Sequence, residues 1–329
     1  MPGLLDPIDI GALRLKNRIV MPPMATNKAA SDGGVTEAHI KHYMERARGV
    51  GLIIVEHSYV TLAGKLNPSQ LGIYDDKLIP SLSKLVKAVH RHRRSIAIQI
   101  NHGGGKSMSS ITGTHPLGPS AVPIFKETPI ELDVDEIDEL VEAFARAAKR
   151  VVEAGFDAVE VHGAHGFLLN QFLSPLTNRR SDRYGGSLGN RARFPLRVLE
   201  GVRKEVGRGF PVLYRLGADD FTEGGLSLED AKVFAEMLGD SGVDGIDVSG
   251  GLAGTNPPGL SGQGYLFPLA EGIKQAVKVP VIGVGGITEE EFADKAVREG
   301  RVDLVAVGRA LLADPEWAVK AIKNLKKKR

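Results

Sequence analysis

Residues 134–162 read VDEIDELVEAFARAAKRVVEAGFDAVEVH, and this stretch predicts one helix followed by one strand. Apolar side chains recur at helical spacing over Val134–Ala154, which predicts an amphipathic helix. Its apolar face consists of Ile137, Leu140, Phe144, Ala147, Ala148 and Val151. Asp133 or Asp135 can cap the start of this helix, and Gly155 ends it. The short run Ala158–His162 has the composition of a buried strand.

The same pairing of a short β-branched run with an amphipathic stretch recurs along the whole chain. The runs predicted as strands are Arg18–Met24, Gly51–Val60, Ser95–Asn101, Ala158–His162, Val212–Leu216, Gly245–Val248, Val279–Val284 and Leu304–Val307. Strands that alternate with helices pair in parallel, and eight such units favour a closed barrel over an open sheet. We therefore predict an α/β fold, a TIM (β/α)8 barrel, as a single domain over residues 1–329.

Two long insertions interrupt the regular alternation of strands and helices. Residues His102–Leu132 follow the third strand, and residues Gly166–Asn190 follow the fourth. Barrel enzymes build their active sites after the carboxyl ends of the strands, and long loops in compact domains are commonly functional. We therefore expect both insertions to border the active site.

The composition is that of an ordinary globular enzyme, with 42% hydrophobic residues, 25% charged residues and a net charge of +2. The chain has no cysteine, which excludes disulfides, thiolate metal sites and a cysteine nucleophile. Neither a secretory signal nor an apolar run of the ~20 residues that span a membrane is found. We expect a cytoplasmic homo-oligomer that acts on a small molecule, without a metal and without binding nucleic acid or membrane.

Two histidines stand at the end of the fourth strand, where residues 159–166 read VEVHGAHG. Residues three apart on a strand point to opposite faces, but a turn at Gly163 would let His162 and His165 both face the barrel mouth. Two neutral imidazoles there can donate hydrogen bonds to a carbonyl or phenolate oxygen. The alternative is a pair of packing or loop histidines. A zinc pair is disfavoured, because it needs helical spacing and an adjacent glutamate.

Glycines end the seventh and eighth strands, where residues 281–288 read VIGVGGIT and residues 305–309 read VAVGR. At Gly285, Gly286 and Gly308 backbone N–H groups can approach an anion closely, and Arg309 adds a forked cation. Phosphate sites recur after these two strands in barrels. Tight turns that merely require glycine are the alternative. The combination of two glycine-rich strand ends with Arg309 favours a phosphate site.

Two polar residues lie within predicted strands, although the side chains that face the inside of a barrel are expected to be apolar. Gln99 ends the third strand and Arg215 lies in the fifth. Such side chains need partners, and an amide and a guanidinium can contact the edge of a polar heterocycle. For Arg215 an ion pair with Glu160 or Asp247 is the alternative.

Three familiar motifs are present only in part. Residues 102–107, HGGGKS, resemble the end of a Walker A loop, but Ile100 stands where the leading glycine belongs. Ser187 lies in a nucleophile-elbow pattern that no strand precedes. Gly285 and Gly286 lack the third glycine of a dinucleotide fingerprint, so a nicotinamide donor would not occupy a domain of its own.

Longer stretches carry a family resemblance. Residues 15–24 read LKNRIVMPPM, residues 99–102 read QINH, residues 168–187 read LLNQFLSPLTNRRSDRYGGS, and residues 190–194 read NRARF. Together with Gly308 and Arg309, they make the whole chain resemble the old yellow enzyme family of flavin oxidoreductases. The chain is also similar to the barrel domain of 2,4-dienoyl-CoA reductase.

The resemblance implies a barrel that holds FMN non-covalently and uses NADH or NADPH as a transient hydride donor. The implied activity is a ping-pong reduction of activated, α,β-unsaturated alkenes, in which His162 and His165 are catalytic and polarise the activating group. The residues implied to bind FMN are Pro22, Pro23, Met24, Ala25, His57, Gln99, Arg215, Gly285, Gly286, Gly308 and Arg309.

The sequence departs from the family pattern at several positions. Phe167 stands where many members have a tyrosine that delivers the α-proton, so either another donor such as Tyr184 or water serves instead, or the reaction differs from ordinary alkene reduction. Ala25 replaces a cysteine or threonine near the reactive flavin edge, and Gly105 replaces an arginine of some relatives. Without cysteines, and with its end at Arg329, the chain is expected to lack the iron–sulfur and nicotinamide modules of longer relatives.

The sequence is also compatible with other functions. One is an amine-oxidising flavin dehydrogenase, although His162 and the single tryptophan, Trp317, disfavour an aromatic amine site. Another is a flavin-binding subunit that passes electrons to a protein partner within a larger complex. A flavin-free phosphate-binding barrel is disfavoured, because no obvious Schiff-base lysine ends a strand.

Overall fold

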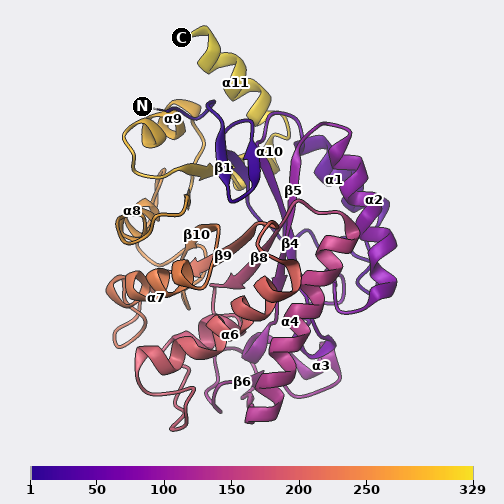
Figure 1. Ribbon diagram of the computed structural model, residues 1–329, viewed down its shortest axis with the longest axis vertical. Helices are drawn as coiled ribbons and strands as arrows, with labels where there is room; N and C mark the ends of the chain where they lie inside the picture. Colours follow the sequence, from indigo (N-terminus) through magenta and orange to yellow (C-terminus); the bar gives the residue numbers. More distant parts are fainter. Residues whose placement is uncertain (1, 329) are drawn as a thin grey trace.

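Eight parallel strands close into a barrel in the computed structural model, which describes residues 2–328 (Figure 1). In spatial order they are β10 (Gly245–Ser249), β11 (Val281–Val284), β12 (Leu304–Ala306), β3 (Ile19–Met21), β4 (Leu52–Tyr59), β5 (Ser95–Asn101), β8 (Ala158–Gly163) and β9 (Val212–Gly217). The predicted TIM barrel is confirmed, and each predicted strand run overlaps one strand of the barrel. The first and last residues of the predicted domain, 1–329, lie outside the described residues.

Helices surround the barrel. The longer ones are α1 (Glu37–Arg46), α2 (Ile79–His90), α4 (Val134–Ala154), α6 (Leu188–Val206), α7 (Leu228–Asp240), α8 (Phe267–Ala276), α9 (Glu290–Arg298) and α11 (Trp317–Lys327). Figure 1 shows α1 and α2 on one side of the barrel and α7 and α8 on the other. Short helices α3 (Ser109–Thr112), α5 (Leu168–Leu173) and α10 (Arg309–Ala313) lie between strands and longer helices. None of the helices within residues 2–328 combines the length and the apolar character that a membrane crossing requires.

Local sequence signals account for both ends of α4. The Asp133 carboxylate accepts a hydrogen bond from the Glu136 backbone N–H at 2.8 Å, and the Glu136 carboxylate accepts one from the Asp133 N–H at 2.8 Å. This reciprocal capping box makes Asp133, and not Asp135, the cap. Gly155 ends the helix with φ of 89°, a conformation that glycine adopts without strain.

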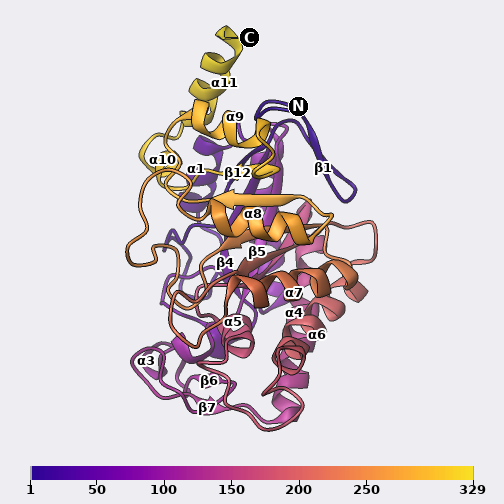
Figure 2. The ribbon, with the colours of Figure 1, turned by 90° about the vertical axis from the view of Figure 1, so that its left-hand side faces the viewer.

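The two insertions lie together at one end of the molecule. The first contains α3 and the short strand pair β6 (Leu117–Gly118) and β7 (Ile130–Glu131), and the second contains α5 (Figure 2). Arg180 of the second insertion donates hydrogen bonds to the carbonyl oxygens of Leu132, at 2.6 Å, and Pro119, at 3.1 Å, of the first. These bonds fix the insertions against each other after strands β5 and β8.

The barrel interior changes from apolar to polar along its length. An inner cluster includes Ala97, Ala158 and Leu213, and Ile10 and Leu15 of the hairpin β1 (Ile8–Ile10) and β2 (Leu13–Leu15) belong to the same cluster. Side chains two residues further along a strand share the same face. The inner positions that follow on the barrel strands are buried and polar, and they hold Gln99, Glu160, Arg215 and Asp247.

Candidate active site

The buried polar layer forms the floor of the candidate site. Gln99 Nε2 donates to Glu160 Oε1 at 2.8 Å, and Arg215 Nη1 lies 3.5 Å from Asp247 Oδ2. Burial raises the pKa of the Asp247 carboxyl, and burial together with Asp247 raises that of Glu160. The ion-pair alternative for Arg215 is therefore realised with Asp247. Arg215 also lines the cavity above, and its buried Nε atom has no partner among the described residues.

A cavity of about 680 Å³ opens above this layer, at the carboxyl ends of the strands. Its volume is in the range of pockets for drug-sized ligands and cofactors. Of the residues predicted to bind a cofactor, those that line it are Pro22, Pro23, Met24, Arg215, Gly285, Gly286, Gly308 and Arg309. The structure therefore brings together residues from four different strands and the loops that follow them.

Two glycines shape the outer part of this cavity. Gly286 has φ of 62°, and a Cβ atom there would lie 2.3 Å from the Gly262 carbonyl oxygen. Gly285 has φ of 134°, and a Cβ atom there would lie 3.0 Å from the Leu266 backbone nitrogen. Any side chain would therefore be strained and would fill the space beside the backbone N–H groups. This is the physical reason why glycine stands at both positions.

Arg309 lies at the same end of the cavity. Its guanidinium carbon lies 5.8 Å from the centre of the Tyr265 ring, and Nη2 lies 3.4 Å from the Tyr265 hydroxyl. A forked cation beside glycine turns fits a phosphate group, and the buried amide and guanidinium fit the polar edge of an aromatic heterocycle. The chemistry and size of the cavity therefore fit FMN.

His162 and His165 come together, although the turn is not where the sequence suggested. Strand β8 continues through Gly163, where a Cβ atom would lie 2.1 Å from the Tyr214 hydroxyl oxygen. The reversal occurs at His165, which has φ of 58°. As a result the two imidazole rings lie with their centres 5.0 Å apart and their planes perpendicular.

The surroundings of both histidines favour their neutral forms. Burial, followed by the nearby His165 and Arg215, holds the pKa of His162 well below its usual range. Burial and the charges of Arg215 and Lys106 do the same to the pKa of His165. His165 Nε2 lies 2.7 Å from the Ser249 hydroxyl, at the end of β10. Neutral imidazoles donate hydrogen bonds without adding a charge to the site.

His57 and Ala25 were also predicted to bind the cofactor, but neither residue lines the cavity. The His57 ring lies 5.4 Å from the Phe167 ring and 6.4 Å from the His162 ring, centre to centre, so it joins the histidine group. Its Nδ1 accepts from Gln70 Nε2 at 2.8 Å, and burial lowers its pKa to about 4. Ala25 is exposed. Gln99 also does not line the cavity, because it is buried in the polar floor.

Sequence reasoning missed several residues that border the site. Glu56 accepts from the Thr26 N–H at 2.7 Å and from the Thr26 hydroxyl at 2.6 Å, which holds the loop that carries Met24. Ser249 is the last residue of β10, the sixth strand along the chain in the barrel, and Tyr265 lies in the loop after it. A place at the end of a barrel strand or in the loop after it is the signal that could have found them. Lys106 was noticed only as part of an incomplete motif.

Tyr184 does not lie where an active-site acid is needed. Its hydroxyl accepts from Arg197 Nη1 at 2.5 Å, and the same guanidinium also binds Asp138 of α4. Arg197 and Asp138 belong to helices α6 and α4 outside the barrel. The suggestion that Tyr184 replaces a proton donor is therefore wrong on geometric grounds.

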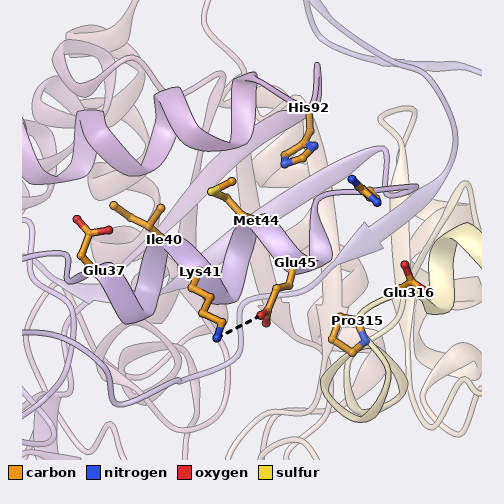
Figure 3. Close-up of a pocket in the computed structure, with 9 residues that line it drawn as sticks. Glu37, Ile40, Lys41, Met44, Glu45, His92, Pro315 and Glu316 are labelled. Atoms are coloured by element: carbon orange, nitrogen blue, oxygen red, sulfur yellow. Dashed lines mark ion pairs between the residues drawn. The ribbon is translucent and has the colours of Figure 1, made fainter.

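A second cavity, of about 660 Å³, lies on the outside of the barrel along α1 (Figure 3). Ile40 and Met44 form its apolar part, and the ion pair between Lys41 and Glu45, 3.9 Å apart, lies beside them. Pro315 and Glu316 border it from the segment before α11. None of the residues predicted for catalysis or cofactor binding lines this groove, so the candidate site is the cavity at the strand ends.

The chain belongs to the NADH:flavin oxidoreductase / NADH oxidase family, whose model matches residues 3–328. It is 47% identical to an NADH oxidase of Thermoanaerobacter brockii over 97% of this chain and 50% of the relative. It is 40% identical to an NADPH dehydrogenase of Listeria monocytogenes over 99% of this chain and 96% of the relative.

Solved structures give the same assignment. A 2-naphthoyl-CoA reductase in complex with 2-naphthoyl-CoA superposes with a TM-score of 0.93 at 31% identity, over 98% of this chain and 52% of that one. The old yellow enzyme homologue of Zymomonas mobilis superposes with a TM-score of 0.86 at 28% identity, over 98% and 93% of the two chains. The resemblance to the old yellow enzyme family is thereby confirmed.

The chain thus belongs to a family of FMN-dependent NAD(P)H oxidoreductases of the old yellow enzyme type. It spans about half the length of the NADH oxidase and of the 2-naphthoyl-CoA reductase, and nearly all of the NADPH dehydrogenase. Membership of this family implies the cofactors FMN and NAD(P)H. It does not identify the substrate of this chain.

Proposed function

We propose that this chain reduces the double bond of activated alkenes, such as α,β-unsaturated ketones, by a ping-pong reaction. The observation that carries the proposal is the pair of neutral, perpendicular imidazoles of His162 and His165, 5.0 Å apart beside the cofactor cavity. Two such donors can bind one oxygen atom and stabilise the negative charge that develops on it during hydride transfer. FMN, when bound, supplies the chemistry of accepting hydride from NAD(P)H and passing it to the β-carbon.

The roles of the other residues follow from their positions. Gly285, Gly286, Gly308 and Arg309 would hold the phosphate of FMN, and Pro22, Pro23 and Met24 would contact its ring system. Arg215 would place its positive charge at the edge of the ring that becomes anionic on reduction. We further propose that residues 1–329 form a single FMN-binding domain and that nicotinamide and alkene use the space beside the histidines in turn.

The test separates the two half-reactions by anaerobic stopped-flow absorbance. NADPH first reduces the bound flavin, and cyclohex-2-enone or ferricyanide then reoxidises it. In His162→Ala we expect the enone to react roughly 100-fold more slowly, because one of two oxyanion donors is lost. Ferricyanide, which needs no polarised carbonyl, should react as with the wild type.

The matched control is His115→Ala, which removes an exposed histidine of the first insertion. This variant should keep wild-type rates in both half-reactions. Wild-type protein that binds FMN, yet whose reduced form reacts with no member of a panel of enones, would refute alkene reduction. Equal enone rates in the wild type and His162→Ala would refute the assignment to the histidine.

A further inference from the structure

Reduction of an alkene needs a proton for the α-carbon as well as a hydride for the β-carbon. His162 and His165 are neutral and are assigned to the activating oxygen, and the side chain of Phe167 carries no acidic proton. The Phe167 ring lies 4.9 Å from the His162 ring, centre to centre, so it borders the place where the substrate would sit. The proposed reaction therefore requires another acid near this ring.

Lys106 of the first insertion brings its ammonium group to this place. Its Nζ atom lies 5.4 Å from the centre of the Phe167 ring and donates a hydrogen bond to the His165 carbonyl oxygen at 2.6 Å. A Cβ atom on Gly166, which has φ of 66°, would lie 3.0 Å from the same Nζ atom. The segment from His165 to Phe167 thus wraps around the ammonium group.

The ammonium group of Lys106 is partly buried and incompletely satisfied. An ammonium has three N–H donors, and within the described residues the bond to His165 is its one hydrogen bond. No carboxylate pairs with it there, and burial lowers its pKa. Removing a cation from water without a counter-ion is costly, and buried lysines give up their proton more readily than exposed ones. An ammonium group that gives up its proton more readily than an ordinary lysine is suited to act as a general acid.

We propose that Lys106 is the catalytic acid that protonates the α-carbon, an assignment that rests on the proposed alkene reduction. As hydride arrives at the β-carbon, the π electrons of the double bond shift toward the activating carbonyl. The α-carbon then takes a proton from Nζ, so that an N–H bond breaks and a C–H bond forms. Nitrogen keeps the electron pair, and solvent restores the proton because Lys106 is only partly buried.

The kinetic test compares Lys106→Met with the wild type on two acceptors of reducing equivalents. Cyclohex-2-enone needs the α-proton for turnover, whereas 1-nitrocyclohexene can accept hydride and leave as a stable nitronate anion. We expect Lys106→Met to slow reoxidation of the flavin by the enone at least tenfold. With the nitroalkene it should keep its rate within about twofold and release nitronate, detected by its ultraviolet absorbance.

The matched control is Lys126→Met on the same insertion. The Lys126 Nζ atom lies 5.6 Å from the centre of the Phe125 ring, a similar cation–ring geometry, but both residues are exposed. This variant should behave as the wild type with both acceptors. A loss of enone and nitroalkene rates in parallel in Lys106→Met would indicate a structural or binding role and would overturn the proposal.

A second measurement requires no turnover. Reductive methylation with ¹³C-formaldehyde labels the lysines, and the resonance that is missing in Lys106→Met belongs to Lys106. We expect this resonance to titrate below the other lysines, and titration in the ordinary lysine range would overturn the proposal. The enone rate should fall as pH rises through the measured pKa, and this limb should be absent in Lys106→Met.

Failure of this proposal is distinguishable from failure of alkene reduction itself. If reduced wild-type protein reacts with no enone or nitroalkene, the proposed function fails and the lysine titration alone remains. If the wild type reacts and Lys106→Met keeps the full enone rate, the assignment of Lys106 fails and alkene reduction stands. If Lys106→Met weakens only the binding of enones that bear a carboxylate, the lysine is an anion-binding residue and not the acid.

Discussion

Arg309 illustrates what a single side chain contributes at the cofactor cavity. It lines the cavity next to Gly308 and touches Tyr265, which comes from the loop after β10. For Arg309→Ala we expect FMN to bind roughly 10- to 100-fold more weakly, because a hydrogen-bonded charge pair with the phosphate is lost. Fluorescence titration of the flavin-free protein with FMN measures this change.

Riboflavin provides the control for Arg309, because it has the same ring system and no phosphate. Its affinity should be the same for the wild type and Arg309→Ala. The residue would not be a phosphate ligand if the substitution weakened riboflavin and FMN equally. Arg309→Lys keeps the charge without the fork and should fall between the two proteins.

The histidine pair shows where residue-level prediction from the sequence stops. The spacing of His162 and His165 was enough to predict that both could face the barrel mouth. Gly163 stays within the strand, where the hydroxyl of Tyr214 on the neighbouring strand leaves no room for a side chain, so this glycine serves close packing and not a turn. Such a contact between distant parts of the chain has no local signal, so the left-handed conformation of His165 was not foreseen.

At the scale of single elements, local signals predicted α4 to the residue, whereas strand ends were less accurate. The capping box and Gly155 act within a few residues of the helix ends, so the sequence contains the needed information. The run Arg18–Met24 became the short strand Ile19–Met21, because pairing with β4 and β12 decides which of its residues belong to the barrel. The pairing register depends on the neighbouring strands, so the residues of one strand alone do not determine where it begins and ends.

The cap of α4 gives an element-scale prediction. Asp133→Ala should lower the free energy of unfolding by about 1 kcal/mol, because two hydrogen bonds of the capping box are lost. Asp135→Ala is the matched control, since Asp135 lies in the first turn and makes no capping bond. Thermal melts of both variants measure the effect, and a larger loss for Asp135→Ala would contradict the assigned cap.

On the scale of the whole molecule, the candidate site is assembled from segments that are far apart in the sequence. The ends of parallel strands could be predicted to meet, and the glycines after β11 and β12 and the arginine after β12 line one cavity. The contacts between the loops that surround the site could not be predicted in the same way. Lys106 reaches Phe167 only because the two insertions pack together, and Tyr265 reaches Arg309 from the loop after β10.

The stability of the whole molecule should depend on pH through histidines that are buried in neutral form. Burial lowers the pKa of His57 and of His102 to about 4, from an ordinary value of 6.5. Between these values the unfolded chain binds protons that the folded chain does not, so stability falls as pH drops from 6.5 toward 4. Below pH 4 the folded form is protonated as well, and these groups add no further loss. The raised pKa values of Glu160 and Asp247 act in the opposite direction.

His102 allows one contribution to be isolated, because its ring is buried and its Nδ1 accepts the Gly104 N–H at 3.0 Å. A glutamine can accept the same hydrogen bond and does not titrate. From pH 6.5 toward pH 4, the wild type should therefore lose stability faster than His102→Gln, by up to about 1.4 kcal/mol per pH unit. Melting temperatures of flavin-free protein across this range measure the difference. His92→Gln, at the rim of the outer groove, should follow the wild type, and parallel curves for the wild type and His102→Gln would show that His102 is not held neutral by the fold.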